Sequence, residues 1–140
     1  MSSTDQHRRA HEAFNERDWA RTVEDLAADA EYTDVPRGVT VKGPAEFIDY
    51  LQGGWTTAFS DAAVTNARYI DGGDTSVALF LATGTNDGSL GPMPATGRAL
   101  SAQFCEVMTF DAAGKIVRGE LFYDQVTLLV QLGRMPPPAG

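Results

Sequence analysis

Carboxylates set among apolar residues are the side chains of this sequence best suited to chemistry. Asp34 follows Tyr32 and precedes a Val-Pro pair, Glu106 lies within the apolar segment 104–108, and Glu120 and Asp124 flank the segment 121–123. Burial disfavours the charged form, so the pKa of a fully buried carboxyl group rises by up to roughly 3–5 units. Such a group acts as a general acid or base near neutral pH, which typically contributes about 10²–10⁴-fold to a rate.

A structural role competes with the catalytic one at each of these positions. Acidic residues commonly occupy the solvent face of a half-buried strand, which is the simpler explanation for Glu120. Asp34 stands beside a proline and suits a turn, whereas Asp124 precedes a helical segment and suits its cap. Glu106 has the most apolar neighbours and is the hardest of the four to assign to the surface.

The sequence offers little to a metal ion. His7 and His11 are its only histidines, and their spacing places both imidazoles on one face of a helix. A metal site needs further ligands, so we predict two half-buried or surface histidines and no metal. Cys105 is the single cysteine, which excludes an internal disulfide and a cysteine-based zinc site. The sequence contains no P-loop, dinucleotide fingerprint, nucleophile elbow or His-Glu-x-x-His motif.

Composition bounds the partners of the protein. The net charge of −8 disfavours binding to nucleic acid and to anionic membranes. The longest strongly apolar run, 77–82, is too short to span a bilayer, and the polar segment 1–17 lacks the apolar core of a secretory signal. These features predict a cytoplasmic protein whose ligand is a small molecule rather than nucleic acid or a membrane.

Helices are predicted in the first third of the chain and strands in the rest. Helical spacing of apolar residues marks the segments 7–14, 19–26 and 44–55, the second capped by Asp18 and the third opened by Pro44. Gly53 and Gly54 weaken the third helix near its end. Strands are predicted at 31–34, 39–42, 63–70, 75–85, 97–110 and 115–123, and a last helix at 125–132.

This order of elements predicts one α+β domain over residues 1–134, with three helices packed on one side of a strongly curved, mainly antiparallel sheet. The helices and the sheet are expected to enclose an apolar pocket. Residues 135–140 form a proline-rich flexible tail. The long strands carry large residues on both faces, so we expect a second copy of the chain to cover the outer face in a homodimer.

Aromatic residues are candidates for the pocket wall, although most of them pack in the core of so small a domain. Strand alternation places Phe104 and Glu106 on one face of their strand, and Phe122 and Asp124 on one face of the last strand. Tyr32 and Gln103 are the polar groups expected to orient a ligand. The predicted ligand contacts are Tyr32, Trp55, Phe59, Gln103, Phe104 and Phe122.

Short motifs in the second half of the chain resemble the SnoaL-like polyketide cyclases, a family with the cone-shaped fold of nuclear transport factor 2 (NTF2). The motifs are 84–88, 94–98, 114–117, 123–124 and 131–133. The resemblance implies an aldol ring closure without metal or organic cofactor. It also implies that the acid ahead of the final Gln-Leu-Gly, here Asp124, is the general acid or base. The family often has His-Trp in the last strand, where this chain has Gly119 and Glu120.

A second resemblance, to the ketosteroid isomerases of the same superfamily, points to other acids. The segment 30–36 is similar to the stretch that carries the proton-shuttling acid of that family, which maps onto Asp34. The segment 106–111 is similar to the stretch that carries its oxyanion-binding acid, which maps onto Glu106. The family's first-helix tyrosine is replaced by Ala10, with His11 adjacent.

The sequence thus predicts an enzyme of the polyketide cyclase type that moves a proton next to a carbonyl group of a small apolar or polycyclic molecule. Asp124, Asp34 and Glu106 are its predicted catalytic residues, in that order, with no cofactor and no metal. Two alternatives stay open: proton shuttling of the isomerase type, and ligand binding without catalysis. An epoxide hydrolase built on Arg118, Glu120 and Asp124 is a more distant third.

Overall fold

The computed structural model describes residues 1–139, so Gly140, the last residue of the predicted tail, lies outside the described part. Its elements, in chain order, are α1 (Ser3–Asn15), α2 (Trp19–Thr22), β1 (Leu26–Asp34), β2 (Val39–Lys42), α3 (Gly43–Leu51), a π-helical turn η1 (Gln52–Thr56), β3 (Ala63–Asp71), β4 (Thr75–Thr85), β5 (Ala99–Phe110), β6 (Ile116–Tyr123) and α4 (Gln125–Gln131).

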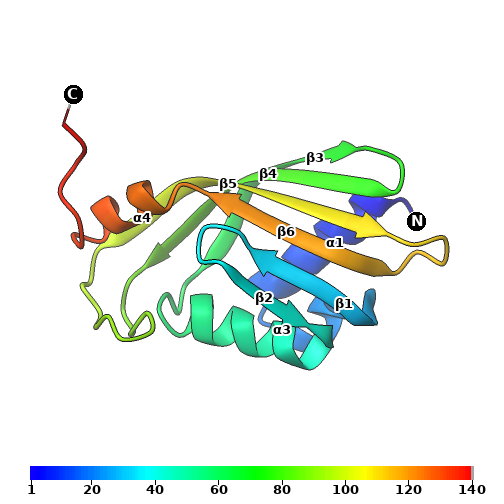
Figure 1. Cartoon of the computed structure of the whole chain (residues 1–140), viewed down its shortest axis with the longest axis horizontal. Coiled ribbons are helices and arrows are strands. Elements are labelled where there is room, and N and C mark those ends of the chain that lie inside the picture. Colours follow the sequence, from blue (N-terminus) through cyan, green and yellow to red (C-terminus); the bar gives the residue numbers. More distant parts are fainter. Residues whose placement is uncertain (140) are drawn as a thin grey trace.

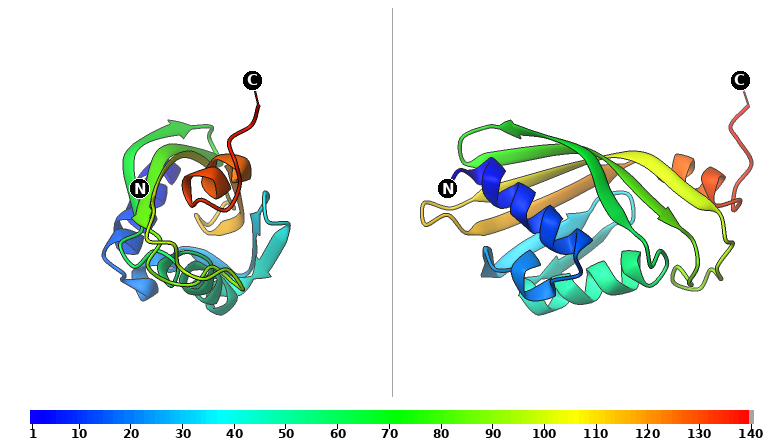
Figure 2. Two further views of the ribbon diagram at one scale, coloured as in Figure 1. Left: turned by 90° about the vertical axis from the view of Figure 1, so that its left-hand side faces the viewer. Right: turned by 180° about the vertical axis from the view of Figure 1, so that it is seen from behind.

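The six strands form one curled sheet in the order β2-β1-β6-β5-β4-β3. Only β1 and β6 pair in parallel, and the other neighbours are antiparallel. Helices α1 and α3 lie across the concave side of the sheet, and α4 lies at the end where the C-terminus leaves (Figure 1). Seen along its length, the sheet wraps around an interior that the helices close (Figure 2). The predicted α+β class and curved sheet are confirmed.

Local signals place the helices. Ser2 accepts the backbone N–H of Asp5 at the start of α1, and Asp18 accepts that of Arg21 at the start of α2. Pro44 occupies the first turn of α3, where its missing N–H costs no hydrogen bond. After Leu51, α3 continues as the π-helical turn that contains the two weakening glycines and carries Trp55.

The predicted second helix is wrong beyond its first turn. Its spacing extended to Leu26, but α2 ends at Thr22 and Leu26 opens β1. Leu26 pairs with Ile116 of β6, and the N–H of Ile116 donates to the carbonyl of Asp25 at 2.7 Å. The pairing with β6 buries Leu26 in the core, so tertiary pairing overrides a helical pattern of only a few residues.

The core lies inside the curl of the sheet. Buried, inward-facing residues alternate with half-buried or exposed ones along β5, and the buried set is Leu100, Ala102, Phe104, Glu106, Met108 and Phe110. None of the helices in residues 1–139 is long and apolar enough to cross a membrane.

Candidate active site

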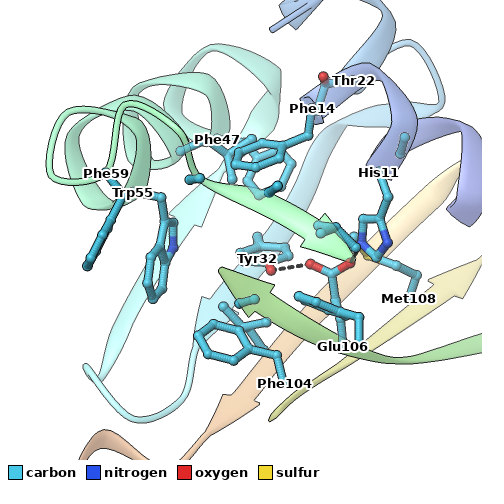
Figure 3. Close-up of a pocket in the computed structure, with 18 of the residues that line it drawn as sticks. His11, Phe14, Thr22, Tyr32, Phe47, Trp55, Phe59, Phe104, Glu106 and Met108 are labelled. Atoms are coloured by element: carbon cyan, nitrogen blue, oxygen red, sulfur yellow. Dashed lines mark hydrogen bonds and ion pairs between the residues drawn. The ribbon is translucent and has the colours of Figure 1, made fainter. Parts of the chain in front are cut away.

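An apolar cavity lies between the concave face of the sheet and helices α1 and α3 (Figure 3). Its volume is about 90 Å³, and most of its lining is aliphatic or aromatic. The polar side chains that line it, among the described residues, are those of His11, Thr22, Tyr32, Thr83 and Glu106. Glu106 is therefore the one carboxylate of residues 1–139 that reaches this space.

Strand alternation turns Glu106 inward from β5. Its cross-strand neighbours are Ala78 of β4 and Leu121 of β6, both buried. Ala78 has the smallest side chain that a non-glycine residue offers, so α1 can approach the sheet closely at this point. Glu106 is only 6% exposed, and a buried carboxylate requires hydrogen-bond donors.

Three side chains hydrogen-bond to the Glu106 carboxylate. His7 and His11, one turn apart on α1, both direct Nε2 at Oε1, at 2.8 and 2.7 Å. The Tyr32 hydroxyl of β1 donates to Oε2. The carboxylate thus joins α1, β1 and β5, and Figure 3 shows Tyr32 and His11 turned toward Glu106.

The far nitrogens of the imidazoles are paired as well. His7 Nδ1 lies 2.8 Å from Ser76 Oγ, and His11 Nδ1 lies 2.8 Å from the Tyr69 hydroxyl. When each Nε2–H donates a hydrogen bond to Glu106, each Nδ1 accepts a hydrogen bond from the Ser76 or Tyr69 hydroxyl, and all four imidazole nitrogens have partners. In this arrangement Glu106 is ionised and accepts all three hydrogen bonds.

Burial alone raises the pKa of Glu106, but the charges and hydrogen bonds of His11 and His7 outweigh it and hold this pKa well below its ordinary value. The expected rise in the pKa of Glu106 is therefore reversed, because the two histidines that lower it lie far from the strand in the sequence. Burial also lowers the pKa of His7, against the effect of Glu106. Burial and the charge of Glu106 raise the pKa of Tyr32 and of Tyr69, so both hydroxyls keep their protons.

Gly119 makes room for Tyr32. A Cβ at Gly119 would overlap the Tyr32 ring and lie 2.9 Å from Met108 Sδ. The absence of a side chain at Gly119 therefore lets the Tyr32 ring lie against β6 and reach Glu106.

Asp34 lies in a second buried cluster at the end of β1, and it is 0% exposed. Its carboxylate accepts hydrogen bonds from the hydroxyls of Tyr50, at 2.6 Å, and Tyr123, at 3.0 Å. The backbone N–H of Arg37 donates to it at 3.2 Å, and Arg37 Nε lies 3.7 Å away. Burial and the charge of Asp34 raise the pKa of Tyr50. Asp34 itself does not line the cavity.

A larger groove of about 620 Å³ borders this second cluster, and Arg37, Tyr50 and Tyr123 form part of its wall. The Arg37 guanidinium stacks on Trp55, with Cζ 4.1 Å from the ring centroid, and Nη1 donates to the Gly54 carbonyl at 3.1 Å. Arg37 Nη2 is buried and has no hydrogen-bond partner within residues 1–139.

The other predicted site residues divide between the cavity and the surface. Trp55, Phe59 and Phe104 line the cavity together with Tyr32. Asp124 caps α4 from an exposed position, where it accepts the Val126 N–H at 3.0 Å and the Thr127 hydroxyl at 2.9 Å. Gln103 and Phe122 are exposed and belong to the outward-facing sets of β5 and β6. The structure therefore does not bring these three to the cavity.

Sequence reasoning missed the partners of both carboxylates. His7 and His11 were separated from the site by 99 and 95 residues, and only the topology joins them to Glu106. Their one available signal was the helical face that they share with Phe14. Tyr50 and Tyr123 lie in segments whose apolar pattern predicts a helix and a strand, and that pattern does not show that their hydroxyls donate to Asp34.

Comparison with protein families now gives the class of the molecule. Residues 7–119 match the model of the SnoaL-like domain. The chain belongs to this family, and the match includes both histidines and Glu106. No curated protein matches the sequence.

Solved structures give the same fold. A proposed polyketide cyclase from Pseudomonas putida superposes with a TM-score of 0.83 at 19% identity, over 94% of this chain and 98% of the other. IdmH, a proposed polyketide cyclase from Streptomyces antibioticus, has a TM-score of 0.77 at 25% identity, over 95% and 99%. AclR, a proposed hydroxylase from Streptomyces galilaeus, has a TM-score of 0.81 at 21% identity, over 96% and 87%. The protein is therefore a SnoaL-like member of the NTF2-like fold.

Proposed function

We propose that the protein is a polyketide-cyclase-like enzyme that removes a proton from a carbon next to a carbonyl group, with Glu106 as the proton acceptor. The observation that carries this proposal is the position of Glu106, an ionised carboxylate at the wall of an otherwise apolar cavity. A base in such a site is shielded from water and meets its substrate with little reorganisation.

The lowered pKa favours this role over the one that the isomerase resemblance implies. An oxyanion-binding acid must be protonated to donate a hydrogen bond. The histidines keep Glu106 ionised, so it can accept a proton but has none to donate. The lowered pKa also makes Glu106 a weaker base, which exclusion of water from the apolar cavity has to offset. Tyr32 keeps its proton and also lines the cavity, and it can donate to a substrate oxygen once its hydrogen bond to Glu106 is released.

His7 and His11 are positioning residues in this mechanism. They fix the orientation of the Glu106 carboxylate through their hydrogen bonds to Oε1, and they stay in contact with it when it takes up the substrate proton. The reaction is internal to the substrate, because the proton removed from one carbon can return to another atom. Such a proton transfer changes no oxidation state, so it needs no redox cofactor.

The size of the cavity limits what enters it. Ligand pockets usually hold roughly 300–1,000 Å³, whereas this cavity holds about 90 Å³. A polycyclic substrate therefore requires the wall to move. Phe14 and Val64 are half-buried lining residues, and they mark the side from which a ligand can arrive. TerC, a structural neighbour with a TM-score of 0.75 at 20% identity, was co-crystallised with polyporic acid, which supports a small-molecule ligand.

The test uses 2-tetralone, an apolar bicyclic ketone with acidic protons next to its carbonyl. Exchange of these protons for deuterium is followed by proton NMR in D₂O. The wild-type protein should accelerate the exchange, and Glu106→Gln should lower the accelerated rate by about 10²–10⁴-fold, the usual contribution of a general base.

Folding of the variant is checked by its melting temperature and its NMR spectrum. Glu120→Gln is the matched control, because Glu120 is a glutamate of the same sheet outside the cavity lining. Equal acceleration by folded Glu106→Gln and wild type would remove Glu106 from the mechanism, whereas no acceleration by the wild type would leave ligand binding without catalysis.

A further inference from the structure

His7, His11 and Glu106 bring two imidazole nitrogens and a carboxylate together at one buried point. Two imidazole nitrogens approach the same carboxylate oxygen, at 2.8 and 2.7 Å, and the ligand atoms that the three side chains offer lie within 4.8 Å of one another. We propose that these three residues, here named the HHE triad, bind a divalent transition-metal ion of the zinc class.

The donor set is one that zinc uses. Two histidines at positions i and i+4 of a helix present both imidazoles on one face, and a glutamate from elsewhere in the chain completes a His₂Glu set with one position left open. His7 and His11 have this spacing on α1, and their ring centroids are 4.7 Å apart. Glu106 supplies the third ligand from β5.

The required movement is small. Zinc binds imidazole nitrogen and carboxylate oxygen at roughly 2.0–2.2 Å, so tetrahedral ligand atoms lie about 3.4 Å apart. The present separations of 2.7 and 2.8 Å lie below that value, so the rings must retreat by about half an ångström. Side-chain rotation on α1 supplies this without a change of fold.

Both imidazoles already have the outer partners that a metal ligand needs. A ligating histidine usually donates its other N–H to an oxygen, which fixes the ring and its tautomer. Ser76 Oγ and the Tyr69 hydroxyl oxygen lie 2.8 Å from the two Nδ1 atoms. On metal binding each neutral ring carries its proton on Nδ1 and donates it to that oxygen, which leaves Nε2 free to coordinate. Tyr32 continues to hold the second carboxylate oxygen.

Burial and charge favour the ion. The relative exposures are 0% for His7, 8% for His11 and 6% for Glu106. The buried Glu106 carboxylate is held here by hydrogen bonds from His7, His11 and Tyr32, and a bound cation would compensate its charge directly. His11 and Glu106 also line the cavity, so the open coordination position faces a space that admits water or a ligand oxygen.

Metal binding and base catalysis exclude each other, a consequence that rests on the proposed function. The ion occupies the Glu106 lone pair that would accept a substrate proton. A loaded site should therefore lose proton transfer, while the site itself exists whether or not the protein is an enzyme.

The test uses protein without a histidine tag, stripped with a chelator and titrated with Co²⁺ at pH 7.5. One Co²⁺ per chain should give visible d–d absorption of low coordination number, and one equivalent of Zn²⁺ should abolish it. His11→Gln and Glu106→Gln should each weaken Co²⁺ binding at least tenfold. Glu120→Gln and Cys105→Ser, which change residues outside the triad, should leave binding unchanged.

Imidazole NMR of the wild-type protein tests the proposal even if the variants fail to fold. The chain has only two histidines, so its imidazole proton NMR signals report the triad alone. Zn²⁺ should shift both sets in a saturable, one-to-one manner. Unshifted imidazole signals, or Co²⁺ binding that survives in folded His11→Gln, would overturn the proposal. Failed deuterium exchange with normal Co²⁺ binding would count against the proposed function and leave the metal site standing.

Discussion

Two buried carboxylates, Glu106 and Asp34, have similar surroundings and different access. Each lies among aromatic residues of the same interior and accepts tyrosine hydroxyl protons. Glu106 adds two imidazoles and reaches the cavity, whereas Asp34 adds the guanidinium of Arg37 and does not reach it. Burial alone therefore does not mark a catalytic acid. Access to the cavity and the type of partner distinguish the two.

The difference in partners has a physical consequence. Arg37 carries a fixed positive charge, so the Asp34 cluster holds a permanent ion pair that links β1, the following turn and the π-helical turn through Gly54 and Trp55. Imidazoles gain and lose protons near neutral pH. The Glu106 centre thus contains two imidazoles, which are groups that can exchange protons near neutral pH. The Asp34 centre contains a guanidinium, which keeps its proton.

Replacing each carboxylate by its amide tests this contrast most strongly. Asp34→Asn should lower the free energy of unfolding by about 3–5 kcal/mol, because it leaves the largely buried Arg37 without its charged partner. The same variant should keep the 2-tetralone exchange rate of the wild type within about threefold, well inside the general-base contribution. Urea denaturation and the exchange assay give both quantities.

Glu106→Gln is the corresponding change at the other carboxylate, and its main effect should be on the rate of 2-tetralone deuterium exchange. A folded Asp34→Asn that loses exchange as completely as Glu106→Gln would break the distinction. It would move the base to Asp34, where the isomerase resemblance places it.

Most of the fold followed from local signals that the structure obeys. Glycine turns, strand alternation and helix caps give the strands and three of the helices within a few residues. The exception is the stretch from Val23 to Ala30: the predicted helix reached Leu26 and the predicted strand began at 31, whereas β1 begins at Leu26. The prediction failed there because the partner strand β6 lies about ninety residues further along the chain. A pairing of that range leaves no trace in a short window of sequence.

The candidate site was predictable only in part, for the same reason. Apolar neighbours singled out Glu106, and alternation put Phe104 on its face. The histidines could not be joined to it without the topology, and the pKa of Glu106 follows from them rather than from the strand. Alternation also separates Gln103 from Phe104, since adjacent strand residues face opposite sides.

Gly119→Ala is the next largest perturbation, and it acts on the Glu106 centre alone. The added methyl group displaces the Tyr32 ring and breaks its hydrogen bond to Glu106. We expect a loss of about 1–3 kcal/mol in the free energy of unfolding, the usual cost of overpacking, together with slower exchange.

Gly53→Ala is the control for Gly119→Ala, because a Cβ at Gly53 meets no atom within 4 Å. It should leave both quantities close to those of the wild type. A Gly119→Ala protein with wild-type stability and exchange would show that Tyr32 does not need its present position.

Acid should weaken the Glu106 centre of the metal-free protein. Burial lowers the folded-state pKa of His7 below 6.5, and the histidines lower that of Glu106 below 4.5, so the unfolded chain binds more protons than the folded one in both ranges. Stability therefore falls as the pH drops below about 6.5, and further below about 4.5.

Urea denaturation at a series of pH values, with a chelator present, measures this dependence. His7→Gln should remove the upper part of the loss. A wild-type stability that is constant from pH 7 to pH 5 would show that His7 is not held neutral by its burial.

Asp124→Asn has the smallest expected effect and decides between the two family-based assignments. The SnoaL-like resemblance makes Asp124 the general acid or base, whereas the structure has it capping α4 from the surface through Val126 and Thr127. The hydrogen bonds from Thr127 and Val126 lower the pKa of Asp124 against the opposing effect of desolvation, as suits a capping carboxylate. Asparagine is also a good cap, so the variant should melt close to the wild type and keep full exchange activity.

Asp124→Ala separates the cap from the charge. It removes the side-chain acceptor for Val126 and should lower the melting temperature slightly, again with full activity. A large loss of exchange in Asp124→Asn, with the melting temperature unchanged, would place the base at the end of β6. That result would require the end of β6 and the start of α4 to move inward when substrate binds, because in the present structure Asp124 is exposed and does not line the cavity. The Asp124 variants therefore test whether the cavity around Glu106 is the reacting centre or only the deeper part of a larger one.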